Sequence, residues 1–123
     1  MTPERLAQEV RGLYGERWAA TGTLEGVLVV AVVGADDGDA ARLRELAPGG
    51  GVLPVALSWV DLEQRMDAVE TALQETREFE AFLQLSADGF TGTVRLVVDR
   101  PVPQVQHWAR QSWGEGALQV ELL

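Results

Sequence analysis

Val29-Val30-Ala31-Val32-Val33 begins the stretch that decides the fold, because a similar stretch begins again at Val94. Residues 29–57 align with residues 94–122. In this alignment the aliphatic runs coincide, as do the glycine turns and the final strands, in which every second residue is apolar. Each copy has the pattern of an apolar strand, a polar helix, a glycine turn and a second strand. The sequence therefore predicts an internal duplication, with two strand–helix–strand units around one core.

The segment before the first copy predicts a helix and a connector. Thr2-Pro3-Glu4 is typical of a helix start, with a capping hydroxyl, a proline and an acidic first turn. The helix is expected to end near Gly15, and residues 18–26 form a connector with room for a short strand. Residues 26–33 are almost entirely aliphatic, as in a strand that is buried on both faces.

The segment between the two copies predicts a long helix. Leu62, Met66, Val69 and Leu73 lie at helical spacing, and together with the following residues they indicate one helix of about 25 residues over 60–85. A break near Thr76–Arg77 is the alternative.

These elements predict an α/β protein in the form of an α+β sandwich. The expected sheet has about four strands, from two βαβ units joined by the long helix. Its size is ferredoxin-like, while the strand order stays open, as does whether the long helix packs on the sheet or forms an association arm. The length of 123 residues fits a single domain, residues 1–123.

The composition is that of a globular protein from a GC-rich bacterial genome. Apolar residues make up 46% and charged residues 24%, which favours a packed core over disorder. All ten basic residues are arginine, and lysine, asparagine, isoleucine and cysteine are absent. No apolar run reaches transmembrane length, and no signal-peptide pattern opens the chain, so we expect a cytoplasmic protein.

The net charge of the chain limits the classes of molecule that it can bind. A net charge of −9 disfavours nucleic acid and membrane surfaces as partners. Acidic residues also outnumber basic ones within 60–85. The acidic sequence therefore points to a protein partner or to self-association.

Three carboxylates follow the first apolar strand. Asp36, Asp37 and Asp39 lie between this strand and the next helix, where oxygen ligands could hold Mg²⁺ or Ca²⁺. The same residues also suit a helix N-terminus, which favours a capping side chain and acidic residues in its first turn. We name these three residues as a candidate metal site, and we expect no cofactor.

Glycine turns follow the helix of each copy. Gly49 and Gly51 end the first helix, and Gly114 and Gly116 end the last one. Glycine permits close approach of a small ligand, and it also forms left-handed helix caps. These four glycines are the candidate ligand-binding residues.

The predicted long helix carries the candidate partner site. Trp59 lies at its start, and Glu63, Asp67 and Glu70 give it an acidic side. Exposed tryptophan is a frequent anchor of protein contacts. A solvated acidic face is the simpler interpretation of the three carboxylates.

No arrangement typical of catalysis is evident, because His107 is the only histidine and no serine lies in a nucleophile-elbow motif. The best expectation is a non-catalytic regulatory or adaptor module that binds a protein partner, as a homodimer. One alternative is a small-molecule-sensing regulatory domain that uses the glycine turns. The other is a small metal-dependent enzyme that uses Asp36, Asp37 and Asp39. The identity of the partner or ligand and the oligomeric state stay open.

Overall fold

The computed structural model describes residues 2–123, which separate into two compact units. Unit 1 extends to Val60 and includes the turn Gly89–Thr91, and unit 2 comprises Asp61–Asp88 and Gly92–Leu123. Both units mix helices and strands, which confirms the α+β class.

Unit 1 is a three-stranded sheet with two helices. Its elements, in chain order, are α1 (Pro3–Tyr14), the 3₁₀ turn η1 (Gly15–Arg17), β1 (Trp18–Leu24), β2 (Val27–Val33), α2 (Asp37–Leu46) and β3 (Gly51–Val55). The strand order is β1-β2-β3, with β1 antiparallel and β3 parallel to the central β2.

Unit 2 has the same order of elements. They are α3 (Trp59–Glu75), the 3₁₀ turn η2 (Phe79–Ala81), β4 (Phe82–Asp88), β5 (Thr93–Val98), α4 (Pro103–Trp113) and β6 (Leu118–Leu122). The strand order is β4-β5-β6, again with an antiparallel hairpin followed by a parallel strand. The first two residues of α3 are grouped with unit 1.

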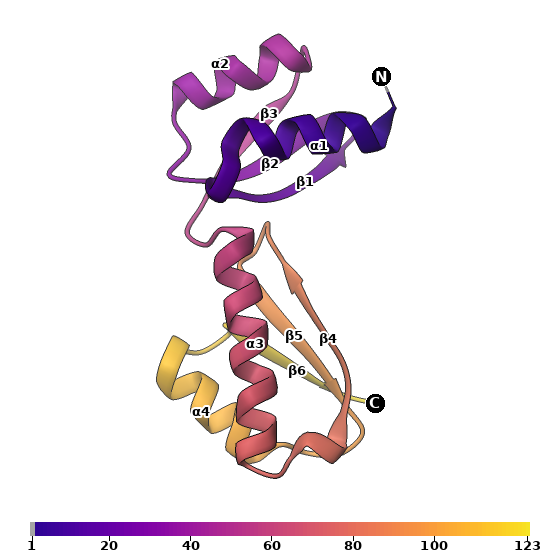
Figure 1. The fold of residues 1–123 in the computed structure, drawn as a ribbon, viewed down its shortest axis with the longest axis vertical. Coiled ribbons are helices and arrows are strands. Elements are labelled where there is room, and N and C mark those ends of the chain that lie inside the picture. Colours follow the sequence, from indigo (N-terminus) through magenta and orange to yellow (C-terminus); the bar gives the residue numbers. More distant parts are fainter. Residues whose placement is uncertain (1) are drawn as a thin grey trace. The chain divides into compact units, whose positions relative to one another are not determined.

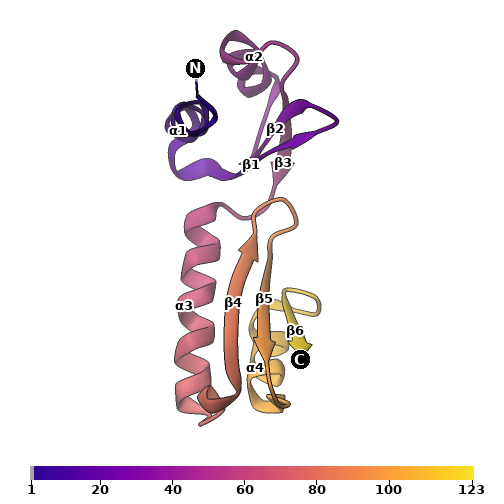
Figure 2. The same ribbon diagram turned by 90° about the vertical axis from the view of Figure 1, so that its right-hand side faces the viewer.

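The prediction of one four-stranded sheet is wrong, because each unit has its own three-stranded sheet (Figures 1 and 2). The two additional strands are β1 and β4, which pair with β2 and β5 as hairpins. Residues 18–24 lack a clear apolar alternation, so the sequence predicts a connector there, with room for a short strand. Phe79 and Leu83 extend the apolar stripe at helical spacing, so the sequence predicts a helix as far as residue 85.

In unit 1, the core lies between the sheet and both helices. Val30 and Val32 of β2 pack with Val10 and Tyr14 of α1 and with Leu43 of α2. All five are buried, so α1 and α2 cover the same face of the sheet (Figure 2). Side chains alternate along a strand, and the odd-numbered residues of β2 therefore face away from the helices.

Unit 2 is built in the same way, with α3 and α4 over one face of its sheet (Figure 1). Alternate residues of β5 are fully buried, whereas Arg95 between them is exposed. The fully buried residues include Val94, Leu96 and Val98 of β5, Leu62, Val69 and Leu73 of α3, Val102 before α4, and Val105 of α4.

A bulge occurs at the same place in both hairpins. Trp18 pairs with Val32 and Ala20 with Ala31, while Phe82 pairs with Val98 and Gln84 with Val97. Val32 and Val98 are therefore equivalent, whereas the sequence alignment placed Val32 on Val97. A slip of one residue in a strand exchanges its two faces. The shared element order is observed, and duplication of the sequence as its origin stays a prediction.

The helix predicted over 60–85 is shorter than expected. Helix α3 ends at Glu75, and Arg77 adopts φ 62°, in the left-handed region. The Glu78 N–H donates to the Leu73 carbonyl at 2.9 Å, as in a Schellman cap. The alternative break near Thr76–Arg77 is confirmed. Among the described helices, none has the combined length and apolarity that crossing a bilayer requires.

Candidate functional site

The outer face of each sheet is the face directed away from its helices. Residues paired across adjacent strands lie on the same face, so the strand pairing identifies the members of each outer face. In sheet 1 (β1-β2-β3) they are apolar residues or glycines: Ala20, Gly22, Leu24, Val27, Val29, Ala31, Val33, Gly51, Leu53 and Val55.

The outer face of sheet 2 (β4-β5-β6) is polar. Its members are Gln84, Ser86, Asp88, Thr93, Arg95, Val97, Gln119 and Glu121. Arg95 and Glu121 form an ion pair on this face, and about half of each side chain is exposed. Such a face is suited to contact with water.

The common pairing pattern allows the two faces to be compared position by position. The equivalent positions, given as sheet 1 then sheet 2, are Ala20 and Gln84, Gly22 and Ser86, and Leu24 and Asp88 in the first strands; Val27 and Thr93, Val29 and Arg95, and Ala31 and Val97 in the central strands; and Gly51 and Gln119, and Leu53 and Glu121 in the third strands. Val29 and Leu53 thus occupy the positions of the ion-paired Arg95 and Glu121. The architecture accepts polar residues on this face, and sheet 1 has none there among the residues described.

Several large apolar side chains on the outer face of sheet 1 are solvent-exposed. Leu24 is 68% exposed, and Val27 and Leu53 are each 43% exposed. Isolated exposed side chains of this kind are common, but a contiguous apolar patch marks an interaction site.

The same face contains a hollow of about 270 Å³. It is lined by Gly22, Thr23, Leu24, Val29, Leu53 and Phe90. Phe90 belongs to the turn that is grouped with unit 1. A Cβ atom on Gly22 would lie 3.2 Å from the Phe90 ring, so the glycine lets the ring lie close to the strand.

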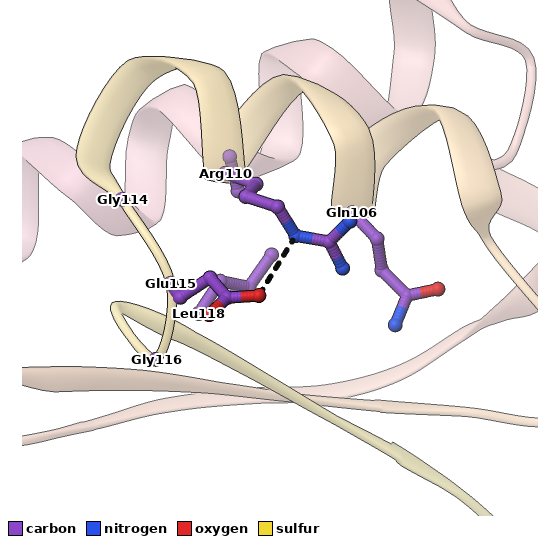
Figure 3. A pocket seen from close by; sticks show the side chains of 7 residues that line it. Gln106, Arg110, Gly114, Glu115, Gly116 and Leu118 are labelled. Atoms are coloured by element: carbon purple, nitrogen blue, oxygen red, sulfur yellow. Dashed lines mark ion pairs between the residues drawn. The ribbon is translucent and has the colours of Figure 1, made fainter.

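In unit 2, a second pocket of about 440 Å³ lies between α4 and β6 (Figure 3). It brings together two of the predicted ligand-binding residues, Gly114 and Gly116, with the side chains of Gln106, Arg110 and Glu115. Gly114 and Gly116 adopt φ 88° and 82°. Arg110 Nε lies 3.9 Å from Glu115 Oε1, so the pocket carries a guanidinium and a carboxylate side by side.

The other two predicted glycines belong to unit 1. Gly49 adopts φ 85° after α2, and Gly51 is the first residue of β3. All four are therefore in turns or at strand starts, but only Gly114 and Gly116 share this pocket. Ligand binding at these glycines stays a prediction.

The acidic loop of unit 1 forms a helix cap and an ion pair. Asp36 is the N-cap of α2, where its side chain accepts from the Asp39 N–H at 2.9 Å and its own N–H donates to Asp39 at 3.0 Å. Both carboxylate oxygens of Asp39 are engaged by Arg17, which also donates to the Val33 carbonyl at 3.2 Å.

These contacts have electrostatic consequences. The hydrogen bond from Arg17 and those from Asp36 lower the pKa of Asp39 below its usual value, against the effect of burial. Burial, followed by the negative charge of Asp39, raises the pKa of Tyr14, whose hydroxyl donates to the Asp39 carbonyl at 2.8 Å. Within residues 2–123, no three acidic or histidine side chains converge as metal ligands.

The predicted partner residues of α3 divide into two groups. Glu63, Asp67 and Glu70 are exposed along the helix. Trp59 is half-buried and packs edge-on against Trp18, with ring centroids 6.2 Å apart. Trp59 is thus occupied by a contact within unit 1, and partner binding by these four residues stays a prediction.

Compared with known proteins, the chain matches no protein-family model, and no curated protein is significantly similar to it in sequence.

The sequence did not identify the outer face of sheet 1. The uninterrupted aliphatic character of residues 26–33 predicts a strand that is buried on both faces. The available signal was the contrast with Thr93-Val94-Arg95-Leu96, where polar residues alternate with apolar ones. The alignment of residues 29–57 with residues 94–122 does not show this contrast, because it pairs inward residues of β2 with outward residues of β5.

Proposed function

We propose that this protein is a non-catalytic binding module that contacts a protein partner through the outer face of sheet 1. The observation that carries the proposal is the replacement of Asp88, Arg95 and Glu121 in unit 2 by Leu24, Val29 and Leu53 in unit 1. The same fold has a hydrated surface in one unit and an apolar surface in the other. Phe90 packs on part of the face in unit 1, but Leu24, Val27 and Leu53 remain exposed. Binding explains best why this exposed part is apolar.

Covering the exposed side chains of this face stabilises a complex by a measurable free energy. Full burial of a leucine or valine side chain contributes about 1.5–3 kcal/mol. Leu24, Val27 and Leu53 have 68%, 43% and 43% of their surface still exposed, so a partner that covers them recovers about half of that amount from each. Such a contribution is large enough to make single truncations measurable, at about tenfold in affinity per 1.4 kcal/mol.

A double substitution tests the proposal. Val29→Arg with Leu53→Glu transfers the ion pair of sheet 2 to the equivalent positions of sheet 1. Unit 2 accepts this pair at the equivalent positions, Leu53 is exposed, and Val29 is half-buried at the open hollow beside Phe90. We therefore expect the variant to fold, with an unchanged circular-dichroism spectrum. It should lose the proteins that the wild-type chain retains from an extract of its own cells, as measured by quantitative mass spectrometry.

A matched control inserts the same charges into the other sheet. Gln84→Arg with Gln119→Glu places one positive and one negative charge on the outer face of sheet 2, where both original residues are exposed. This control should retain every wild-type partner. Equal retention by wild type, double variant and control would contradict the proposal.

The acidic side of α3 is a separate part of the same functional hypothesis. Reversing the charges at Glu63, Asp67 and Glu70 should abolish a contact with a cationic partner without unfolding the chain, because all three are exposed. If this variant keeps all partners while Val29→Arg with Leu53→Glu loses them, the contact belongs to sheet 1 alone.

A second candidate function is the sensing of a small molecule, which the pocket between α4 and β6 favours. This pocket offers the Arg110 guanidinium and the Glu115 carboxylate next to each other, and therefore suits a small zwitterion such as an amino acid. A thermal-shift screen with amino acids, nucleotides and common metabolites tests it. A ligand at 100 times its Kd adds about 2.7 kcal/mol of stability, and Arg110→Ala should remove that shift while Arg100→Ala should not. A flat response to the whole panel would argue against this function.

The third alternative, a metal-dependent enzyme that uses Asp36, Asp37 and Asp39, has less support. The side chains of Asp36 and Asp39 are engaged with each other's backbone, and Asp39 is also bound by Arg17. Titration with Mg²⁺ and Ca²⁺ at millimolar concentration tests it, with Asp37→Ala as the variant that should lose binding.

A further inference from the structure

We infer that the partner on the outer face of sheet 1 is a second copy of this chain, packed face to face about a two-fold axis. This inference rests on the proposed function and names the partner. In a two-fold interface the same surface serves on both copies, so that surface must be complementary to itself in charge and in shape.

The charge condition is met. Two chains of net charge −9 repel each other in general, but the outer face of sheet 1 contributes no charged side chain among residues 2–123. Two copies that meet on this face bring no like charges into direct opposition. A cationic partner, in contrast, would find on this face no carboxylate with which to pair.

The shape condition is met by a projection and a hollow on the same face. Leu24 projects at the end of β1 and is 68% exposed. Beside it lies the hollow of about 270 Å³, which Gly22 deepens and Phe90 borders. In the dimer, Leu24 of each copy enters the hollow of the other, and Val27 and Leu53 cover the surrounding surface. Aligned packing of two sheets in this manner is a common arrangement of β-sandwiches.

Sedimentation velocity over a range of protein concentrations tests self-association directly. We expect the wild-type chain to shift from monomer to dimer as its concentration rises. Leu24→Asp introduces the residue found at the equivalent position 88 of unit 2, and it should weaken the dimer at least tenfold. Gln84→Asp places the same charge on the outer face of sheet 2 and should leave the dimer unchanged. Circular dichroism confirms that both variants are folded.

The salt dependence distinguishes a second copy from a cationic partner. The interface contains no ion pair, and the repulsion between the two acidic chains is screened by salt, with a Debye length of about 10 Å at 0.1 M and about 3 Å at 1 M. The dimer should therefore become tighter as sodium chloride rises from about 20 to about 500 mM. A dimer that dissociates over this range would overturn the proposed interface.

Cross-linking tests the arrangement of the two copies. The sequence contains no cysteine, so Leu24→Cys and Asp88→Cys each provide a single thiol at equivalent positions of the two units. A disulfide requires Cα atoms within about 7 Å. Mild oxidation should link Leu24→Cys chains much faster than Asp88→Cys chains, because Leu24 lies near the two-fold axis. Equal rates for the two variants would overturn the arrangement.

The outcomes separate this inference from the function on which it rests. A chain that stays monomeric up to about millimolar concentration overturns the second copy as partner. If Val29→Arg with Leu53→Glu still loses proteins that the wild type retains, the binding face remains correct and its partner is a different protein. If neither self-association nor retention responds to the substitutions, both the inference and the proposed function fail.

Discussion

At the scale of single residues, Asp39 shows how one residue, through its side chain and its backbone, can join three segments. Its carboxylate completes the capping box of α2 and accepts hydrogen bonds from Arg17, and its backbone carbonyl accepts a hydrogen bond from the Tyr14 hydroxyl of α1. Only 6% of its side chain is exposed, while 45% of the Arg17 side chain is exposed. The sequence predicted an acidic loop here, and the contact with Arg17 gives that loop a structural explanation.

The lowered pKa of Asp39 gives a prediction for stability against pH. A carboxyl group with a lower pKa in the folded state stabilises that state above its unfolded pKa of about 3.9, and this contribution is lost as the pH falls through the folded value. We expect Asp39→Asn to lower the free energy of unfolding at pH 7 by about 1–2 kcal/mol, because the cap and the ion pair weaken. The difference should narrow below about pH 4.

Urea unfolding of wild type and variant between pH 3 and 8 measures this difference. Asp37→Asn is the control, since Asp37 is exposed in the same helix turn. A difference between wild type and Asp39→Asn that is independent of pH would show that the charge of Asp39 does not contribute.

At the scale of elements, the end of α3 gives a second prediction. Arg77 occupies the left-handed position of the cap, which glycine adopts at less cost than other residues. Arg77→Gly should therefore raise the free energy of unfolding by about 0.5–1 kcal/mol. Gln64→Gly, at an exposed position in the interior of α3, should lower it by about 1 kcal/mol. Thermal and urea unfolding measure both, and a destabilised Arg77→Gly protein would contradict the proposed cap.

The same elements show what the sequence can predict. The segments with a strong sequence pattern, such as the apolar stripe of α1 and the aliphatic runs of β2 and β5, lie where the sequence predicts them. The hairpin strands β1 and β4 are less evident in the sequence. Ala19-Ala20-Thr21-Gly22 has little pattern and predicts only a connector with room for a short strand, and Leu83 extends a helical stripe into the start of β4. The pairing that creates the strands is a tertiary contact, and local sequence does not encode it strongly.

The candidate sites also differ in how far the sequence alone predicts them. The glycine turns were recognisable because Gly114 and Gly116 follow a helix in the sequence, and the structure adds Arg110 and Glu115 to their pocket. The outer face of sheet 1 was not recognisable, since its identity depends on which neighbour each strand acquires. Only the register of three strands unites Leu24, Val29 and Leu53 on one surface.

At the scale of the whole molecule, the two units act as controls for each other. They share element order, strand pairing and the bulge at the start of each hairpin, but they differ in the polarity of one sheet face. The structural equivalence makes an exchange of residues between them a reasonable experiment. A function that depends on this face should follow the exchanged residues.

The reverse exchange gives a prediction at this scale. Arg95→Val with Glu121→Leu introduces the residues of sheet 1 into sheet 2. We expect this variant to fold and to gain a second apolar surface, and therefore to bind more of a dye that fluoresces on apolar surfaces than the wild type does. Arg95→Gln with Glu121→Gln removes the same charges without adding apolar groups and should bind no additional dye. Equal fluorescence of the two variants would contradict the equivalence of the faces.

The most direct test of the central claim is amide hydrogen exchange of the wild-type chain at low and at high protein concentration. The two sheets serve as mutual controls within one sample. The account predicts that rising concentration slows exchange in β1 and β3 of unit 1, where the outer face is apolar, and leaves β4 and β6 of unit 2 unchanged. Slowed exchange confined to β4 and β6, or no change in either sheet over a range in which the chain self-associates, would contradict it.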